Sequence, residues 1–366
     1  MVIEEKELKQ TYKYVATNTR SNVSYTLLSK LPNTFSINNR RYLGNKYKLN
    51  EFIKATIIRE CGDFTTFADL FAGTGAVASM FQDKHLIVND LLYSNYVCHQ
   101  TWFGTEEFSF KRICNYINEY NSTFISKENY MSKNYSDTFF SKENCKKIGY
   151  IRENIEQNYK NNYINYREKC ILITSLLYAM DKIANTCGHY DAYRKSGNLD
   201  KKLVLLVPNI RQNNADNEIY NEDINNLVKS VSADVIYLDP PYNSRQYCDS
   251  YHLLENVACW KKPQVSGIAK KMDRTNLKSE YCTISAPKAF DKLIKNINAK
   301  YIVLSYNNMS NKGNDRSNAK LHDEDILRIL EAKGTVKIFS QEYKAFSTGK
   351  SNIKENAERL FVCKCF

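Results

Sequence analysis

The stretch that decides the fold is Phe67-Ala68-Asp69-Leu70-Phe71-Ala72-Gly73-Thr74-Gly75. Its apolar first half predicts a short buried strand, and its two glycines predict a tight turn directly after that strand. The apolar pattern resumes at Ala76-Val77-Ala78, which predicts a helix, and His85-Leu86-Ile87-Val88 predicts a second strand that ends at Asn89-Asp90. A strand, a glycine turn, a helix and a strand within about 30 residues form one βαβ unit, so a parallel sheet is expected.

The same alternation returns in the second half of the chain. The last two of the strands expected there resemble a closing antiparallel pair, and Phe52, Ile53 and Ile57 have the spacing of a helix ahead of the first strand. We therefore expect an α/β fold with a mixed, mainly parallel sheet. The further predicted strands cover residues 218–220, 234–238, 301–305, 336–339 and 360–366.

Residues 95–212 interrupt the alternation of strands and helices. They are rich in Asn, Tyr, Lys and Ser and contain one strongly apolar helix, from Cys170 to Ala184. A segment of this length is too long for a connecting loop, so we predict an inserted, mainly helical domain. The predicted parts are then an N-terminal arm or cap (1–37), a catalytic domain (38–94 and 213–366) and the insertion (95–212).

The composition excludes several classes of protein. With 366 residues, of which 43% are hydrophobic, the chain is long enough for a sizeable core in two domains or in one with an insertion. No run reaches the roughly 18 apolar residues of a membrane-spanning helix, and the first residues lack the pattern of a secretory signal. The eleven cysteines are scattered and lack zinc spacing. We expect a cytoplasmic protein with reduced thiols, no metal site and no membrane partner.

The charge balance favours a polyanionic partner. Fifty-two Lys and Arg against forty Asp and Glu give a net charge of +12. Residues 261–320 hold 13 basic and 4 acidic side chains, so the excess is concentrated in one segment. This distribution indicates a surface that faces nucleic acid. The alternative is the compositional drift of an AT-rich genome, which also enriches Asn, Lys, Ile and Tyr.

The glycine turn is a candidate ligand site. Gly73 and Gly75 let the backbone approach a ligand closely, and Asp90 ends the next strand, where a carboxylate can accept hydrogen bonds from ribose hydroxyls. The third glycine of the G-x-G-x-x-G fingerprint is missing, since Ala78 stands in its place. A structural tight turn and a solvated aspartate remain the alternatives.

Asp239-Pro240-Pro241-Tyr242 is the sharpest chemical signal. The apolar strand before it delivers Asp239 to the carboxyl edge of the sheet, where open α/β folds bind their ligands. The two prolines stiffen the backbone and remove two donors. What remains is a carboxylate, the Pro240 carbonyl and the Tyr242 ring, a set that suits a planar ring with an amino group. The alternative is a rigid turn with a capping residue.

With these motifs the chain resembles the Dam-like (alpha-group) adenine-specific DNA methyltransferases. That family has, in order, a Tyr-x-Gly-x-Lys segment, a Phe-x-Gly-x-Gly turn, an inserted DNA-recognition domain and Asp-Pro-Pro-Tyr. Here the three motifs are Tyr42 to Lys46, Phe71 to Gly75 and Asp239 to Tyr242. The stretches 239–256 and 184–193 are similar to the modification methylases of restriction systems of FokI and NlaIII type, and the resemblance covers about residues 38–366.

One residue departs from the family pattern. The family usually has a second glycine in the first motif, where this chain has Asn45. Asparagine tolerates positive φ better than most residues, so we expect the turn to survive.

The resemblance implies a Rossmann-like S-adenosylmethionine-dependent methyltransferase fold. It also implies methyl transfer from S-adenosylmethionine to the N6 amino group of an adenine flipped out of a short site in double-stranded DNA. The setting would be a restriction–modification system, in which a restriction endonuclease is the functional counterpart and the methyltransferase is a monomer. The alternatives are an RNA adenine methyltransferase and a catalytically inactive DNA-binding relic.

The resemblance and the residue chemistry together nominate three sets of residues. The catalytic set is Asp239, Pro240 and Tyr242. The donor-binding set is Tyr42, Lys46, Asp69, Phe71, Gly73, Gly75, Asp90 and Asp223, in which Asp90 would hold the ribose and Asp223 the adenine of the donor. The DNA-binding set is Arg194, Lys195, Arg245, Lys270, Lys271 and Arg274, each of which has a solvated charge or a structural ion pair as its alternative.

Overall fold

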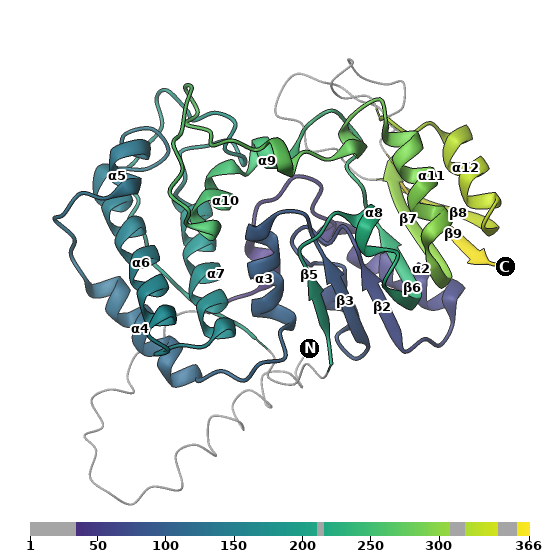
Figure 1. Ribbon diagram of the computed structural model, residues 1–366, viewed down its shortest axis with the longest axis horizontal. Coiled ribbons are helices and arrows are strands. Elements are labelled where there is room, and N and C mark those ends of the chain that lie inside the picture. Colours follow the sequence, from purple (N-terminus) through teal and green to yellow (C-terminus); the bar gives the residue numbers. More distant parts are fainter. Residues whose placement is uncertain (1–33, 211–215, 308–318, 343–356) are drawn as a thin grey trace, which may run out of the picture. The chain divides into compact units, whose positions relative to one another are not determined.

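The protein contains a seven-stranded sheet (Figure 1). The computed structural model describes residues 34–210, 216–307, 319–342 and 357–366. The strand order is β5-β3-β2-β6-β7-β9-β8. Neighbours from β5 to β7 are parallel, while β9 is antiparallel to both β7 and β8, so the prediction of a mixed, mainly parallel sheet is confirmed. The strands are β2 (Thr66–Asp69), β3 (His85–Asn89), β5 (Glu218–Tyr220), β6 (Ser232–Leu238), β7 (Asn298–Asn307), β8 (Gly334–Glu342) and β9 (Ala357–Cys365).

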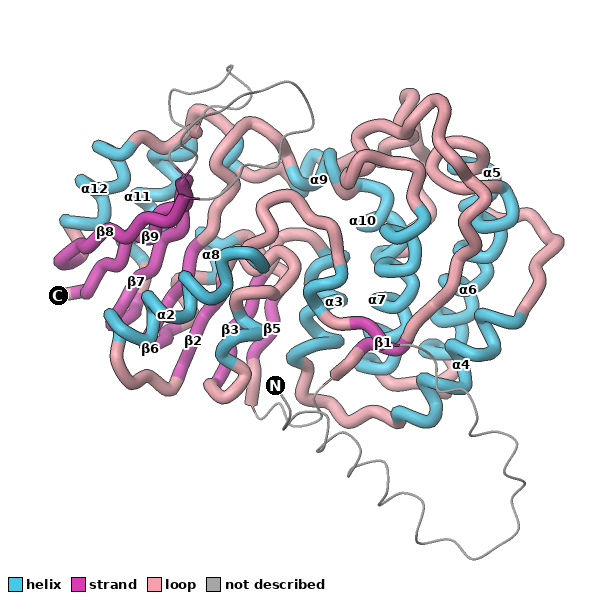
Figure 2. Tube along the Cα trace, turned by 180° about the vertical axis from the view of Figure 1, so that it is seen from behind, coloured by secondary structure: helices cyan, strands magenta, loops and turns pink. Residues whose placement is uncertain are grey.

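Helices cover both faces of this sheet, and side chains of β6 are buried on both of them. Val235 and Tyr237 point into one hydrophobic core with α2 and α3, while Ile236 and Leu238 point into a second core with α8, α11 and α12. A strand buried on both faces must be apolar throughout, as the sequence 235–238 is. Figure 2 shows α2 lying across the first face. These helices are α2 (Asn50–Cys61), α3 (Tyr93–Phe103), α8 (Ile224–Leu227), α11 (Ala286–Asn296) and α12 (Asp323–Glu331).

The chain reverses its direction across the sheet between β2 and β6. From β2 the order runs outward through β3 to β5, and after α8 the chain continues at β6 on the other side of β2. Open α/β sheets bind ligands at the carboxyl ends of the strands that flank such a switch point. Asp69 ends β2 and Asp239 follows β6, so both carboxylates lie at this point.

Residues 93–183 form a group of helices in which α7 is the most buried. The predicted helix at Cys170 is confirmed as α7, which packs against α3, α4, α6 and α10. Arg152 on α6 donates hydrogen bonds to the carbonyls of Val257 and Ala258, so α10 belongs to the same packing unit although it lies outside the predicted insertion. The role of these helices in recognition stays a prediction. Their bounds are α4 (Phe110–Ser122), α5 (Tyr130–Tyr135), α6 (Lys142–Lys160), α7 (Tyr166–Ile183), α9 (Tyr247–Ser250) and α10 (His252–Cys259).

The structure corrects one predicted element and adds a strand pair. After the glycine turn the chain forms only a short 3-10 helix, Ala78–Phe81, where the sequence predicted a regular helix. Residues 76–84 alone connect the turn to β3, and Phe81 stacks on Phe67 at 4.3 Å between ring centroids, so the chain bends back early. The unpredicted parallel pair is β1 (Thr34–Phe35) with β4 (Val207–Pro208). The predicted arm, 1–37, lies mostly outside the described residues. No helix in the described part is long and apolar enough to cross a membrane.

Gly75 is required by the backbone and by the packing beneath the turn. Its φ is +82°, and an added Cβ would lie 3.0 Å from Phe103 and 3.2 Å from Ile37. We expect Gly75→Ala to lower the free energy of unfolding by about 2–4 kcal/mol, because a positive φ and overpacking add. Urea unfolding measures this loss. Gly267→Ala is the matched control, since φ there is +71° but no atom lies within 4 Å of the added Cβ. Equal losses in the two variants would contradict the packing role.

Candidate active site

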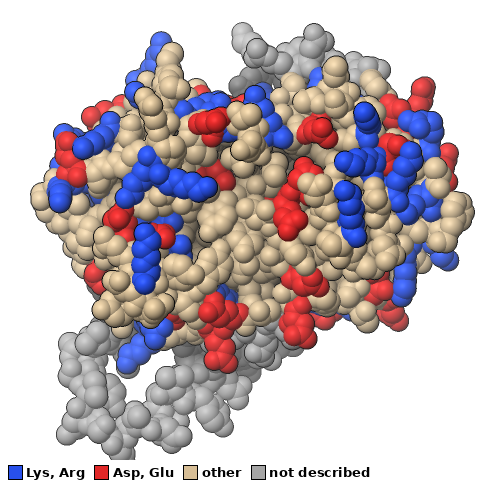
Figure 3. All heavy atoms as spheres, viewed as in Figure 1, with Lys and Arg blue, Asp and Glu red and all other residues tan. Residues whose placement is uncertain are grey.

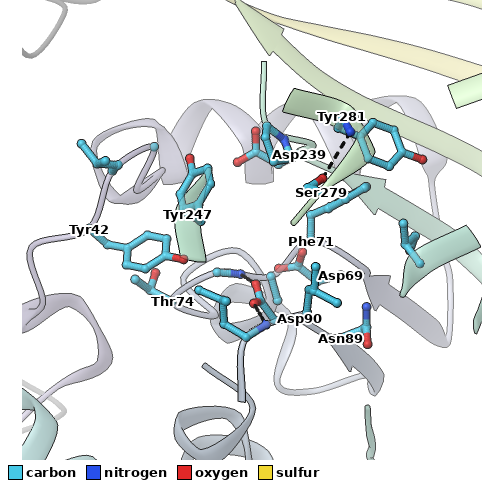
Figure 4. A pocket seen from close by; sticks show the side chains of 18 of the residues that line it. Tyr42, Asp69, Phe71, Thr74, Asn89, Asp90, Asp239, Tyr247, Ser279 and Tyr281 are labelled. Carbon is cyan, nitrogen blue, oxygen red and sulfur yellow. Dashed lines mark hydrogen bonds between the residues drawn. The ribbon is translucent and has the colours of Figure 1, made fainter. Parts of the chain in front are cut away.

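A pocket with about 920 Å³ of empty space, part of it open to solvent, lies at the carboxyl ends of β2, β3 and β6. Figure 4 shows Asp239 toward one end and Asn89 with Asp90 toward the other. Every residue of the predicted donor-binding set lines this pocket except Gly75. The sequence therefore identified, from three distant motifs, residues that the fold brings to one place. Gly75 instead faces the core, as its contacts with Phe103 and Ile37 show.

Asp90 organises the glycine turn. Its carboxylate accepts hydrogen bonds from the backbone N–H of Gly73 at 2.9 Å and the backbone N–H of Leu92 at 2.8 Å (Figure 4). It also accepts one from the Asn95 side chain at 3.1 Å. Burial raises the pKa of Asp90 to about 6, and the three hydrogen bonds oppose that rise. Gly73 itself has a φ of +53°, a conformation that glycine adopts without strain. The predicted ribose ligand is thus also the residue that shapes the turn.

Asp69 places an unpaired polar atom at the pocket. One carboxylate oxygen accepts a hydrogen bond from the backbone N–H of Ala78 at 3.2 Å, while the other is buried and has no hydrogen-bond partner among the described residues. Burial and the nearby Asp239 raise the pKa of Asp69 well above its ordinary value. A buried oxygen without a partner is costly unless a ligand or water satisfies it. This oxygen therefore favours a polar ligand in the pocket.

Aromatic rings line the side of the pocket that leads to Asp223. Phe71 meets Tyr281 edge to face at 5.1 Å between ring centroids, and Asp223 caps α8 by accepting a hydrogen bond from the backbone N–H of Asn225. A carboxylate beside aromatic faces suits the amino group and ring of an adenine. Tyr281 was not predicted, because nothing in the local sequence around it marks a site.

Three stacked tyrosines hold the segment that carries Lys46. Tyr42 stacks on Tyr251 with 4.3 Å between ring centroids and on Tyr247 with 5.5 Å. Tyr247 lines the pocket and was missed by the sequence analysis. An added Cβ on Gly44 would lie 2.8 Å from the Tyr247 hydroxyl, and the φ of Gly44 is +73°.

The prediction that the Tyr42–Lys46 turn survives is confirmed, although its reason was wrong. Asn45 is not among the residues with positive φ, so only Gly44 needs the freedom of glycine. The Asn45 side chain instead accepts a hydrogen bond from the backbone N–H of Tyr47 at 3.0 Å and donates one to the carbonyl of Arg40. Arg40 is buried and forms an ion pair of 3.0 Å with Asp181, which ties this segment to α7.

Lys46 connects two carboxylates. Its ammonium lies 2.9 Å from the Asp239 carboxylate and 3.3 Å from that of Glu358, a residue of β9 that the sequence analysis did not single out. Burial raises the pKa of Asp239 to about 6; Lys46 lowers it and Glu358 raises it. Burial alone lowers the pKa of Lys46, but the two carboxylates outweigh burial and raise it well above its ordinary value. The ammonium is therefore charged.

The other two predicted catalytic residues lie beside the pocket rather than in its lining. Pro240 is buried, and the Tyr242 ring meets Tyr306 edge to face at 6.4 Å between ring centroids. The carbonyl of Tyr242 accepts a hydrogen bond from the backbone N–H of Lys320 at 2.7 Å, which fixes the turn. Their roles toward a substrate stay predictions.

The six predicted DNA-binding residues divide into two kinds. Arg194, Lys195 and Arg245 are exposed and Lys270 is half-buried. Lys271 pairs with Asp191 at 2.7 Å and Arg274 with Asp249 at 2.7 Å, so the charges of these two residues are already neutralised.

Arg194 also belongs to a second, strongly polar pocket. Arg194 lines it together with Arg41, Lys182 and Lys201. Asp181, the one acidic residue that lines it in the described part of the chain, pairs with Arg40 and accepts a hydrogen bond from the Tyr190 hydroxyl at 2.8 Å. Figure 3 shows Lys and Arg gathered on both sides of one face, with a largely uncharged band and some acidic side chains between them.

This fold and site define a class. The mainly parallel sheet with an antiparallel strand between β7 and β8, and a pocket of carboxylates and aromatic rings at its switch point, are consistent with the methyltransferase fold. Residues 42–316 match the family of D12 class N6 adenine-specific DNA methyltransferases, and the chain belongs to that family.

Known members resemble most of the chain. It is 35% identical over 355 residues to the modification methylase StsI of Streptococcus sanguinis, covering 88% of this chain and 51% of StsI. It is 32% identical to M.FokI of Planomicrobium okeanokoites, covering 87% of this chain and 51% of M.FokI, and 32% identical to M.NlaIII of Neisseria lactamica, covering 85% of this chain and 93% of M.NlaIII. The chain thus spans about half the length of StsI and M.FokI.

Proposed function

We propose that this chain methylates the N6 amino group of an adenine that is flipped out of a short site in double-stranded DNA. The methyl donor is S-adenosylmethionine, and the modification protects DNA in a restriction–modification system from a restriction endonuclease. The observation that carries the proposal is the position of Asp239, which lines the same pocket as Asp90, Phe71 and Asp223. Family membership favours DNA as substrate, so the RNA and relic alternatives are not carried forward.

The pocket fits S-adenosylmethionine. Asp90 offers carboxylate oxygens to ribose hydroxyls, Phe71 offers an aromatic face to the adenine, and Asp223 accepts from its amino group. The buried oxygen of Asp69, which has no hydrogen-bond partner among the described residues, gives the ammonium of the methionine part an acceptor. When bound, this donor supplies a methyl group on a positively charged sulfonium.

Asp239 and Pro240 act on the target amino group. The lone pair of that nitrogen is shared with the adenine ring, so the nitrogen is a poor nucleophile. Hydrogen bonds from its two N–H groups to the Asp239 carboxylate and the Pro240 carbonyl draw the lone pair out of the ring and orient it. Orientation of this kind supplies up to about 7–11 kcal/mol.

Tyr242 stabilises the flipped base. Flipping an adenine out of a duplex costs a few kcal/mol. Stacking on the Tyr242 ring returns about 1–3 kcal/mol of that cost.

Sequencing of genomic DNA tests the proposed function. The chain is expressed in a bacterium without DNA methylation, and its DNA is read by single-molecule sequencing, with an empty vector and Asp239→Ala as controls. N6-methyladenine is expected at one recurrent short sequence and in neither control. An unmodified genome, from cells with soluble protein that binds S-adenosylmethionine, would refute the proposal.

The DNA backbone is proposed to cross the polar pocket that holds Arg194. Arg41, Lys182, Arg194 and Lys201 converge there from three separate segments of the chain, and Asp181, the acidic side chain among the described lining residues, already has partners. Clustered cations of this kind bind phosphates. Arg41 precedes Tyr42 of the donor pocket, so a duplex held here lies beside the active site. Lys195, Arg245 and Lys270 stay candidates for further phosphate contacts, whereas Lys271 and Arg274 are weaker ones because Asp191 and Asp249 neutralise them.

Charge reversal tests this path. Lys182→Glu with Arg194→Glu is expected to weaken duplex binding at least about tenfold at low salt and to reduce the slope of log affinity against log salt by about 1–2. Fluorescence anisotropy at several salt concentrations measures both quantities. The matched control is Lys288→Glu with Lys292→Glu on α11, which changes charge equally but contributes no residue to the pocket. An equal loss of duplex affinity in both double variants would show that the DNA backbone does not cross this pocket.

A further inference from the structure

Glu358 is a carboxylate near Asp239 that no motif marks. It lies on β9, where it pairs with Asn307 of β7. Its side chain is 3% exposed, and one carboxylate oxygen accepts both the Ser305 hydroxyl at 2.6 Å and the Lys46 ammonium at 3.3 Å. The cluster around Lys46 therefore contains Asp239, which directly follows β6, Ser305 of the neighbouring strand β7 and Glu358 of β9.

We propose that Glu358 is a positioning residue for methyl transfer: by binding Lys46 it holds the ammonium beside Asp239 and leaves the Asp239 carboxylate able to accept the amino group of the target adenine. The inference rests on the proposed function. It concerns the contact of Glu358 with Lys46, because Glu358 itself does not line the pocket.

The geometry explains why a second carboxylate is needed. A buried ammonium with Asp239 as its only partner would occupy that carboxylate, since ion pairs strengthen where water is excluded. At 3.3 Å from Glu358, Lys46 keeps a partner when the substrate takes the Asp239 oxygen. The Ser305 hydroxyl fixes Glu358 in this position.

The charge of the cluster also favours the reaction. Two carboxylates around one ammonium leave one net negative charge, and the amino nitrogen becomes positive as it accepts a methyl group. A fixed negative charge near a developing positive one lowers the barrier. Without the charge of Glu358, the cluster would be neutral.

Glu358→Gln tests the proposal because glutamine keeps the shape and the acceptor for Ser305 but removes the charge. We expect kcat to fall about 10–100-fold, while the dissociation constants for duplex DNA and S-adenosylmethionine stay within about threefold. Ser305→Ala is expected to act in the same direction with a smaller effect. The matched control is Asp323→Asn, which removes the carboxylate paired with Arg359, the next residue of β9, and is expected to leave kcat unchanged.

The pKa of Asp239 distinguishes the proposed role of Glu358 from a purely structural one, because a purely structural role would leave that pKa unchanged. The ionisable groups that face Asp239 are Lys46 from the loop, Asp69 from β2, Tyr237 from β6, Tyr247 from α9 and Glu358 from β9. Glu358 is the group among them whose negative charge directly raises the pKa of Asp239. In Glu358→Gln the titration of Asp239, followed by carbon NMR on labelled aspartate, and the acid limb of kcat are both expected to move to lower pH.

The outcomes separate this proposal from the proposed function. A wild-type chain that methylates DNA, together with a Glu358→Gln variant of unchanged kcat and unchanged Asp239 titration, would overturn the role of Glu358 alone. A loss of donor or DNA binding in that variant, equal to its loss of activity, would also overturn it. A wild-type chain that binds the donor but methylates no DNA would overturn both.

Discussion

Replacing Asp239 by alanine is expected to lower the rate of DNA methylation by about 10³-fold or more while donor binding persists. In the proposed mechanism the carboxylate orients the target amino nitrogen, and removal of one such preorganised contact costs about 10²–10³ in rate before any loss of proton transfer is counted. In the variant Lys46 keeps Glu358 as its partner, so the buried ammonium is not stranded. Single-turnover methylation at saturating donor measures the rate, and calorimetry measures donor binding.

Two further observations sharpen the test of Asp239. Asp239→Asn is expected to lose nearly as much activity, because an amide cannot offer the charge of the carboxylate. Burial raises the pKa of Asp239 to about 6, so kcat is expected to fall as the pH drops below about 6, where the carboxylate becomes protonated and can no longer accept both contacts. Near-normal turnover in Asp239→Ala would refute the mechanism.

Asp90→Ala is expected to raise the dissociation constant of S-adenosylmethionine about 100-fold. The substitution removes the proposed acceptor for the ribose hydroxyls and also the partner that the backbone N–H of Gly73 has at 2.9 Å. Hydrogen bonds to a charged group contribute about 1.5–3 kcal/mol each, and about 2.7 kcal/mol corresponds to 100-fold in affinity. Calorimetry at neutral pH measures the change.

The variant Asp90→Asn distinguishes the proposed contact of Asp90 with the donor from its role in shaping the glycine turn. Asparagine retains one acceptor oxygen for Leu92, so the unfolding free energy is expected to change less than in Asp90→Ala while donor binding stays weak. Since the pKa of Asp90 is raised to about 6 by burial, donor affinity of the wild-type chain is expected to weaken below that pH. Unchanged donor binding in Asp90→Ala would show that Asp90 does not bind the donor.

Most of the sheet could be predicted because its strands are locally marked. The strands that contain Asp234 to Leu238 and Tyr301 to Ser305 are nearly continuous apolar runs, as strands buried on both faces must be. The prediction of a regular helix after Gly75 was wrong, because hydrophobic periodicity does not show tertiary constraints. Here the connection to β3 is short, and Phe81 turns back onto Phe67.

The residues of the pocket could be predicted where they stand at the end of a strand. Asp69, Asp90 and Asp239 each stand at a strand end, and parallel strands bring such ends to one edge. Tyr247 and Tyr281 carry no such mark, since they reach the pocket from α9 and from a short 3-10 helix, Glu280–Cys282, whose positions depend on packing. Nothing in the sequence shows that Lys271 pairs with Asp191 and Arg274 with Asp249, and their role as phosphate ligands stays a prediction.

The sequence by itself determined the class of fold, the order of the motifs and the residue types at the ends of the strands, because these depend on local apolar patterns and turn chemistry. Only the tertiary structure decided which charges meet. Lys46 and Glu358 are far apart in the chain, and their contact exists because β9 inserts antiparallel beside β7 and brings a buried carboxylate within 3.3 Å of the ammonium. A charge that is solvated in an unfolded chain acquires a specific partner only where burial makes an unpaired charge too costly.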